Sequence, residues 1–170
     1  RNATGFHASL GAIIEASPDY DSGTRAIAFD NNNNGFDAWG NAAINANGAS
    51  STSNVHGFNA NSGAYISANR WMRMDGNTVV YDHVAESLNN DWWGFSASNG
   101  AVIEASESTS HQNGWDGFWA HMGAIIQAGQ SEATENGRDG YTADNGSVIG
   151  AVATSSHKTC TSGYGNGFRS

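Results

Sequence analysis

The sequence predicts an all-β protein, a parallel β-helix solenoid of about six to seven coils of about 23 residues with three short strands each. A twelve-residue template, G-F-x-A-x-x-G-A-x-I-x-A, occurs in six copies along the chain. Apolar residues alternate within each copy, which is the periodicity of a strand and not of a helix. Alanine, glycine, asparagine and serine make up about half of the 170 residues, so the core must be built mainly from small side chains.

The strands and turns of one coil follow from the template. In the first copy, the alternation predicts one strand over residues 6–8 and a second over residues 12–16, and residues 131–133 represent the third strand. An asparagine four residues before a repeat glycine (Asn31, Asn90, Asn113 and Asn136) indicates a turn between coils. The copies begin at Gly5, Gly35, Gly57, Gly94, Gly117 and Gly140, and a seventh opens at Gly167. We therefore expect residues 1–170 to form a single repeat domain, a fragment of a longer chain.

Stacking of the coils predicts which residues form the core. Equivalent positions of neighbouring coils lie about 4.8 Å apart, and one coil cannot bury its inner face without its neighbours. The tenth template position is isoleucine and the twelfth is alanine in all six copies, while the second is phenylalanine or tyrosine. These three columns are predicted to fill the interior.

An apolar column is also predicted on the outside of the solenoid. The ninth template position should face outward, yet it is occupied by Ile13, Ala43, Tyr65, Val102, Ile125 and Val148. Large exposed apolar surfaces are unusual in monomers. We predict that this stripe is the interface of a homo-oligomer. The alternative is that a segment outside this fragment folds over it.

The repeat units resemble those of bacteriophage tail fibres and tailspikes, whose right-handed parallel β-helices are similar to the pectin-lyase fold and assemble as trimers. The resemblance covers nearly the whole chain through the template defined above. It implies a homotrimer, an extracellular location in the virion, and a host cell-surface polysaccharide as the partner. Capsular polysaccharide depolymerases (hydrolases or lyases) and bacterial surface adhesins have similar coils and remain alternatives. The template contains no catalytic signature to transfer.

Charge and composition exclude several classes of partner. The formal net charge is −9 with only seven lysine and arginine residues, so binding to nucleic acid through phosphates is not expected. The sequence has no apolar run of about 18 residues, so no membrane insertion is expected. Cys160 is the only cysteine and the six histidines lack the spacing of metal ligands. We therefore predict neither a metal site nor a cofactor.

The largest departure from the repeat is an insertion at about residues 69–82. It contains Arg70, Trp71 and Arg73, and exposed tryptophan beside arginine suits a sugar ring. We predict that these three residues bind glycan. The alternative is that Trp71, with the neighbouring Met72 and Met74, packs the insertion against another chain.

Four further tryptophans form the second predicted glycan site. Trp92 and Trp115 each lie two residues before a repeat glycine, so they should stack in adjacent coils with Arg138 next in the column. Trp93 and Trp119 are close by in the sequence. Because oligomer interfaces also favour tryptophan, packing between chains is an equal alternative.

Two carboxylates are candidates for catalysis. Asp116 and Asp139 each precede a repeat glycine one coil apart. Stacking would place their carboxylates about 5 Å apart, the separation in a retaining glycosidase. Aspartate before glycine is equally what a turn requires, so this assignment competes with a structural one.

Overall fold

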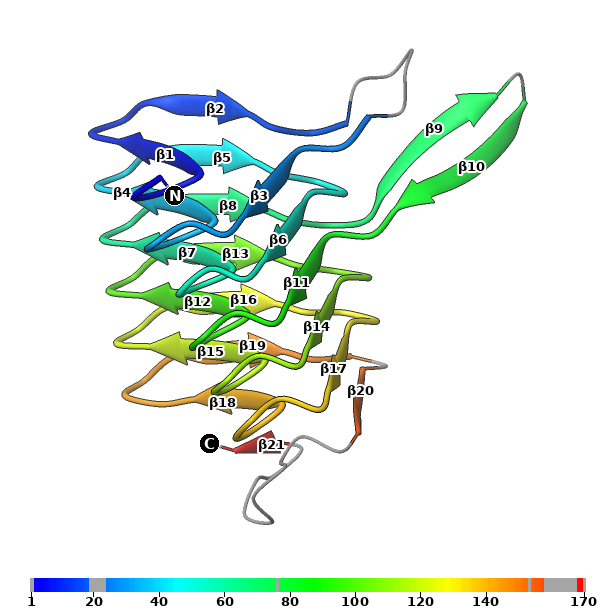
Figure 1. The fold of residues 1–170 in the computed structure, drawn as a ribbon. Helices are drawn as coiled ribbons and strands as arrows, with labels where there is room; N and C mark the ends of the chain where they lie inside the picture. The colour runs from blue at the N-terminus through cyan, green and yellow to red at the C-terminus, as the bar shows by residue number, and fades with distance from the viewer. Residues whose placement is uncertain (1, 19–23, 76, 153, 158–167, 170) are drawn as a thin grey trace.

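The computed structural model describes residues 2–18, 24–75, 77–152, 154–157 and 168–169. These residues form strands, turns and bends, and none of them is helical. Three parallel sheets run along the length of a solenoid, and successive strands of the chain move from one sheet to the next (Figure 1). The predicted all-β solenoid of stacked parallel strands is therefore confirmed.

Each coil adds one strand to each sheet in template register. The first sheet contains β1 (Phe6–Ser9), β4 (Phe36–Trp39), β7 (Phe58–Asn61), β12 (Phe95–Ser98), β15 (Phe118–His121), β18 (Tyr141–Ala143) and β21 (Phe168–Arg169). The second contains β2 (Ile13–Glu15), β5 (Ala43–Asn45), β8 (Tyr65–Ser67), β13 (Val102–Glu104), β16 (Ile125–Gln127) and β19 (Val148–Gly150). The third contains β3 (Ile27–Phe29), β6 (Ser50–Thr52), β11 (Glu86–Leu88), β14 (Thr109–His111), β17 (Glu132–Thr134) and β20 (Ser155–His157).

An aromatic column runs through the interior along the first sheet. Its rings stack with centroids 4.7–4.8 Å apart and planes within 8° of parallel. The spacing equals the distance between neighbouring strands, so every coil adds one ring. The members are Phe6, Phe36, Phe58, Phe95, Phe118, Tyr141 and Phe168.

Isoleucine and alanine complete the core. Ile44, Ile66, Ile103 and Ile126 of the tenth position are fully buried in the second sheet. The twelfth position is buried alanine wherever a coil has neighbours on both sides, from Ala46 to Ala128. A narrow interior of repeated small columns explains how a chain with few large apolar residues buries a continuous core.

Glycine is required at the start of each copy because the coils approach closely there. A Cβ atom on Gly94 would lie 2.1 Å from Ser110 Oγ and 2.6 Å from the carbonyl oxygen of Gly117. The seventh position has a different requirement, since Gly100 has a φ of 72°. Asn41 replaces glycine there in the second copy with a φ of 60°, a conformation that asparagine tolerates.

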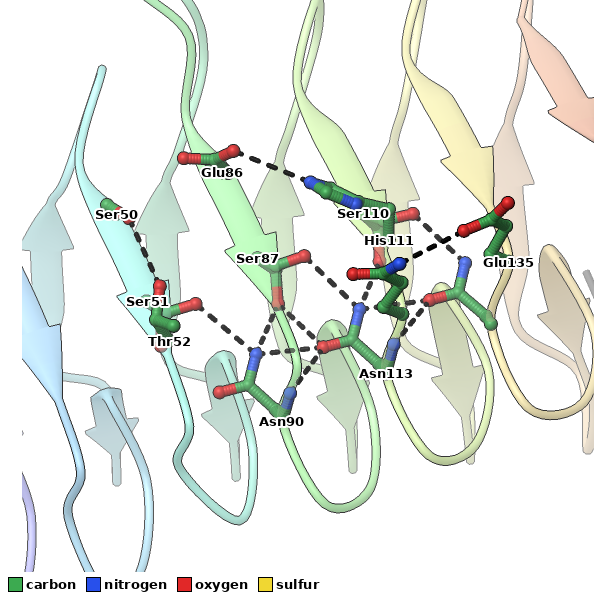
Figure 2. A network of polar contacts seen from close by, with 12 residues as sticks. Ser50, Ser51, Thr52, Glu86, Ser87, Asn90, Ser110, His111, Asn113 and Glu135 are labelled. Atoms are coloured by element: carbon green, nitrogen blue, oxygen red, sulfur yellow. Dashed lines mark hydrogen bonds and ion pairs between the residues drawn. The ribbon is translucent and has the colours of Figure 1, made fainter.

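A buried asparagine ladder connects the turns between the third and first sheets. Asn90, Asn113 and Asn136 lie in successive coils, and each side-chain oxygen accepts the backbone N–H of the asparagine before it (Figure 2). Asn54 also belongs to the ladder, because its N–H donates to Asn90 Oδ1 at 3.0 Å. The four-residue spacing missed Asn54, which lies only three residues before Gly57.

The insertion at residues 69–82 contains a β-hairpin. β9 (Trp71–Asp75) pairs antiparallel with β10 (Thr78–His83), with an irregularity in the register between Tyr81 and His83. The hairpin extends away from the solenoid at the corner between the second and third sheets (Figure 1). At its base, Arg70 Nη1 lies 3.3 Å from Glu107 Oε2.

The outer face of the second sheet displays the apolar ninth position. Ile13, Ile125 and Val148 are 72%, 40% and 57% exposed, so no described segment covers them. Tyr65 is half-buried, and its hydroxyl donates to Glu104 Oε2 at 2.7 Å. The stripe therefore exists as a surface feature of the single chain.

Candidate functional site

A groove lies where the turn after the third sheet meets the outer face of the first sheet. Its volume is about 320 Å³, and we call it the tryptophan groove. It combines aromatic faces, carboxylates and guanidinium groups, which is the chemistry of sugar recognition. Its lining residues are Trp93, Trp115, Asp116, Trp119, Arg138, Thr142, Ala143, Asp144 and Arg169.

One wall of the groove comes from residues two positions before the repeat glycines. Trp92 and Trp115 stack in adjacent coils, with ring centroids 5.0 Å apart and planes 5° from parallel. The guanidinium carbon of Arg138 lies 5.2 Å from the Trp115 ring centroid, which is a cation–π distance. This part of the predicted cluster is confirmed as a continuous column.

The opposite wall comes from the third template position, which faces outward from the first sheet. Trp119, Thr142 and Arg169 occupy this position in three successive paired strands. Trp93, Asp116 and Asp139, which directly precede repeat glycines, lie in the chain between the two walls. The alternating direction of side chains along a strand points the third-position wall outward, and the turn before each repeat glycine places the other wall beside it.

Contacts between coils join the aromatic residues into one cluster. Trp93 stacks on Trp119 with ring centroids 4.2 Å apart, and its ring meets Trp115 edge-on at 5.1 Å. His56 stacks on the other side of this cluster, 4.9 Å from Trp93, and His121 stacks on Trp119 at 4.9 Å. The sequence carries no signal for these two contacts, because the histidines occupy a turn position and a strand position that do not recur as aromatic residues in the template.

The two candidate catalytic carboxylates are part of the turns beneath the groove. Asp116 and Asp139 are only 1% and 3% exposed, and Asp116 Oδ1 accepts the backbone N–H of Asp139 at 2.9 Å. Burial raises the pKa of Asp116, and the Asp139 N–H and the charge of Arg138 oppose that shift. These contacts are those of carboxylates that hold neighbouring coils together. A catalytic role for the pair stays a prediction.

Acid is expected to destabilise the protein through His56. Burial lowers the pKa of His56 to about 4 in the folded state, so the folded protein favours the neutral imidazole. In the unfolded chain the pKa of His56 has its ordinary value of 6.5. Its contribution to stability is present above pH 6.5 and is lost as the pH falls toward 4, by up to about 3 kcal/mol. Urea unfolding at pH 7, 5.5 and 4 measures this loss.

The matched variant for this experiment is His56→Phe, which keeps a ring against Trp93 and removes the titrating group. Its stability should fall less steeply with acid than that of the wild type. The raised pKa of Asp116 acts in the opposite direction and is common to both proteins. Parallel curves for the two proteins would contradict the assignment to His56.

The structure divides the predicted glycan-binding residues into two sets. Trp92, Trp93, Trp115 and Trp119 come together at the corner between the third and first sheets. Arg70, Trp71 and Arg73 instead lie at the base and on the first strand of the hairpin, at the corner between the second and third sheets (Figure 1). The two sets are therefore separate surfaces, and the hairpin set stays a prediction.

Within the described part of the chain, no group of three or more histidine, cysteine, aspartate or glutamate residues could hold a metal ion. Cys160 lies outside the described residues. A helix long and apolar enough to span a membrane is likewise not found among the described residues. Comparisons of the chain with protein-family models, curated proteins and solved structures found no match.

Proposed function

We propose that this chain is a structural and receptor-binding β-helix that binds a host cell-surface glycan in the tryptophan groove. The observation that supports this most is the groove itself, where the aromatic side chain of Trp119 lines a wall beside the guanidinium groups of Arg138 and Arg169. Aromatic faces stack on the apolar faces of sugar rings, and guanidinium groups donate hydrogen bonds to their oxygens. The resemblance to phage tail fibres and tailspikes supports an extracellular virion component as the setting for this function.

Binding is favoured over cleavage by the burial of the candidate acids. A general acid or nucleophile must reach the glycosidic bond directly. Asp116 and Asp139 are almost completely covered, and one oxygen of Asp116 is already hydrogen-bonded to the backbone. A capsular polysaccharide depolymerase remains the alternative, and release of oligosaccharides from a host capsule would support it. A bacterial surface adhesin would use the same groove for binding.

Loss of one groove tryptophan is expected to weaken glycan binding. Trp119→Ala removes one wall, so affinity for bound polysaccharides on an array of purified bacterial surface glycans should fall at least about 10-fold. Trp39→Ala is the matched control, because Trp39 is an exposed tryptophan of the same sheet but lies outside the groove lining. Thermal unfolding of both variants checks the fold. Equal binding by the two variants would contradict the proposal.

We further propose that the coils are right-handed and that three chains associate through the apolar stripe. Parallel crossover connections within one sheet are almost always right-handed. The stripe includes Ile13, Ile125 and Val148, all exposed in the single chain, and a groove of about 290 Å³ beside Tyr65. Association would remove this apolar surface from water.

A trimer is the expected species at micromolar concentration, and sedimentation equilibrium measures it. Val102→Glu adds a charge at the centre of the stripe and should shift the protein toward the monomer. Val79→Glu is the matched control, because it makes the same substitution at a valine that is 45% exposed in β10 of the hairpin, outside the stripe. A wild-type monomer at this concentration would contradict association.

A further inference from the structure

The tryptophan groove changes in chemistry along the solenoid axis. On one wall, Trp115 is followed by Arg138 in the next coil, and on the other, Trp119 is followed by Thr142 and then by Arg169. Neighbouring strands are about 4.8 Å apart, so the guanidinium groups lie about one to two coil rises from the aromatic faces. One end of the groove is therefore aromatic and the other end is cationic.

The carboxylates near the cationic end are buried and lie close to the exposed arginines. The side chains of Asp116 and Asp139 are 2% and 5% exposed, whereas those of Arg138 and Arg169 are 46% and 57% exposed. The ion pairs are 3.9 Å for Arg138 Nε to Asp116 Oδ1 and 3.7 Å for Arg169 Nη1 to Asp139 Oδ2. Both exceed hydrogen-bond length, so these carboxylates position the guanidinium groups without taking up their N–H donors in those contacts.

The second carboxylate of the groove lining, Asp144, is engaged with a histidine. Asp144 Oδ1 is paired with His121 Nδ1, the ring that stacks on Trp119. The Asp144 side chain is 42% exposed, about as much as that of Arg138, so a ligand in the groove meets this carboxylate as a paired group and the two arginines as N–H donors. This arrangement stands out in a chain with a net charge of −9, because two of its seven basic residues are at one end of one groove.

We propose that the groove selects an acidic polysaccharide, with one sugar ring packed against Trp119 and the anionic substituent of an adjacent sugar bound by Arg138 and Arg169. Guanidinium groups bind carboxylate, sulfate and phosphate through paired N–H donors, so all three substituents share the required chemistry. The negative charge of the rest of the molecule disfavours binding of the same polymer elsewhere. This inference rests on the proposed glycan-binding function of the groove.

The test compares acidic polysaccharides with their own neutral forms. The full chain is applied to an array of purified bacterial surface polysaccharides that bear carboxylate, sulfate or phosphate groups. Each is printed beside a carboxyl-reduced, desulfated or dephosphorylated counterpart. We expect removal of the anionic group to weaken binding at least about 10-fold. The substituent whose removal has this effect identifies the anion.

Two variants connect this selectivity to the groove. Arg138→Gln and Arg169→Gln should each lower affinity for the acidic form about 10-fold and leave affinity for the neutral form nearly unchanged. Arg25→Gln is the matched control, because it removes the same charge at an ion pair with Glu86, outside the groove lining. It should bind both forms as the wild type does, apart from a small loss that disappears in added salt.

The outcomes separate this inference from the proposed function. Equal binding of acidic and neutral forms, still lost in Trp119→Ala, would overturn acidic selectivity and leave glycan binding in place. If Arg25→Gln reduces the selectivity as much as Arg138→Gln does, the selectivity comes from the overall charge of the protein. That result would overturn the role of the groove. Binding to no polysaccharide on the array would overturn both proposals.

Discussion

Replacing Phe95 with alanine is expected to lower the free energy of unfolding by about 3–5 kcal/mol. Phe95 is fully buried, and its ring stacks between Phe58 at 4.8 Å and Phe118 at 4.7 Å. Removal of the ring leaves a cavity in the middle of the aromatic column and deletes two stacking contacts at once. Because each coil contacts only its neighbours, only the isoleucine and alanine columns and the strand pairing would then connect this coil to the next.

Urea unfolding followed by tryptophan fluorescence measures the effect of the Phe95 change. Phe29→Ala is the matched control, because Phe29 is 63% exposed in β3 and its loss should change stability by no more than about 0.5 kcal/mol. The slope of the transition also matters, since separate unfolding of the two halves would reduce it. A loss below about 1 kcal/mol for Phe95→Ala would contradict the structural role of the column.

Replacing Asn113 with alanine is the second change with a large expected effect, again a loss of about 3–5 kcal/mol. Asn113 Oδ1 accepts from the backbone N of Asn90 at 3.1 Å and from Asn90 Nδ2 at 2.8 Å. Its Nδ2 lies 3.0 Å from both Ser110 Oγ and Asn136 Oδ1 and 3.2 Å from the carbonyl oxygen of Ser87. All of these groups are buried, so alanine would leave several of them without partners (Figure 2).

Asn33→Ala is the matched control for the ladder. Asn33 is an exposed asparagine in an equivalent turn, and its carbonyl oxygen, which accepts the N–H of Val55, is kept in the variant. Its stability should remain within about 0.5 kcal/mol of the wild type. Comparable unfolding midpoints for Asn33→Ala and Asn113→Ala would show that the ladder contributes little.

The interior of this protein was predictable because the same residue types fill it in every coil. A residue that fills one inner position must meet its own equivalent in the next coil, so the recurrence of phenylalanine, isoleucine, alanine and asparagine indicates the stacked columns directly. The same logic predicted that Trp92 and Trp115 would stack with Arg138 next. The spacing rule missed Asn54, because its turn is one residue shorter and Asn54 lies three residues before Gly57 instead of four.

The outer surface was less predictable, because there the neighbours come from different template positions. The stacking of Trp93 on Trp119 joins a turn position of one coil to a strand position of the next. The stacking of His56 on Trp93 and of His121 on Trp119 likewise does not follow from the template. The pairing of Thr78 with Asp75 that closes the hairpin also lies outside the template, since only the inserted strands themselves specify it.

The sequence by itself determined the stacked strands, the inner columns and the turns, because vertical neighbours in a solenoid are equivalent residues of successive copies. Only the tertiary structure decided which outward-facing columns lie beside one another. The distance between two such columns depends on how the turn bends between two sheets, and the repeat pattern in the sequence does not specify that bend. The tryptophan groove, with its tryptophans and exposed arginines, exists because one such bend brings two columns together.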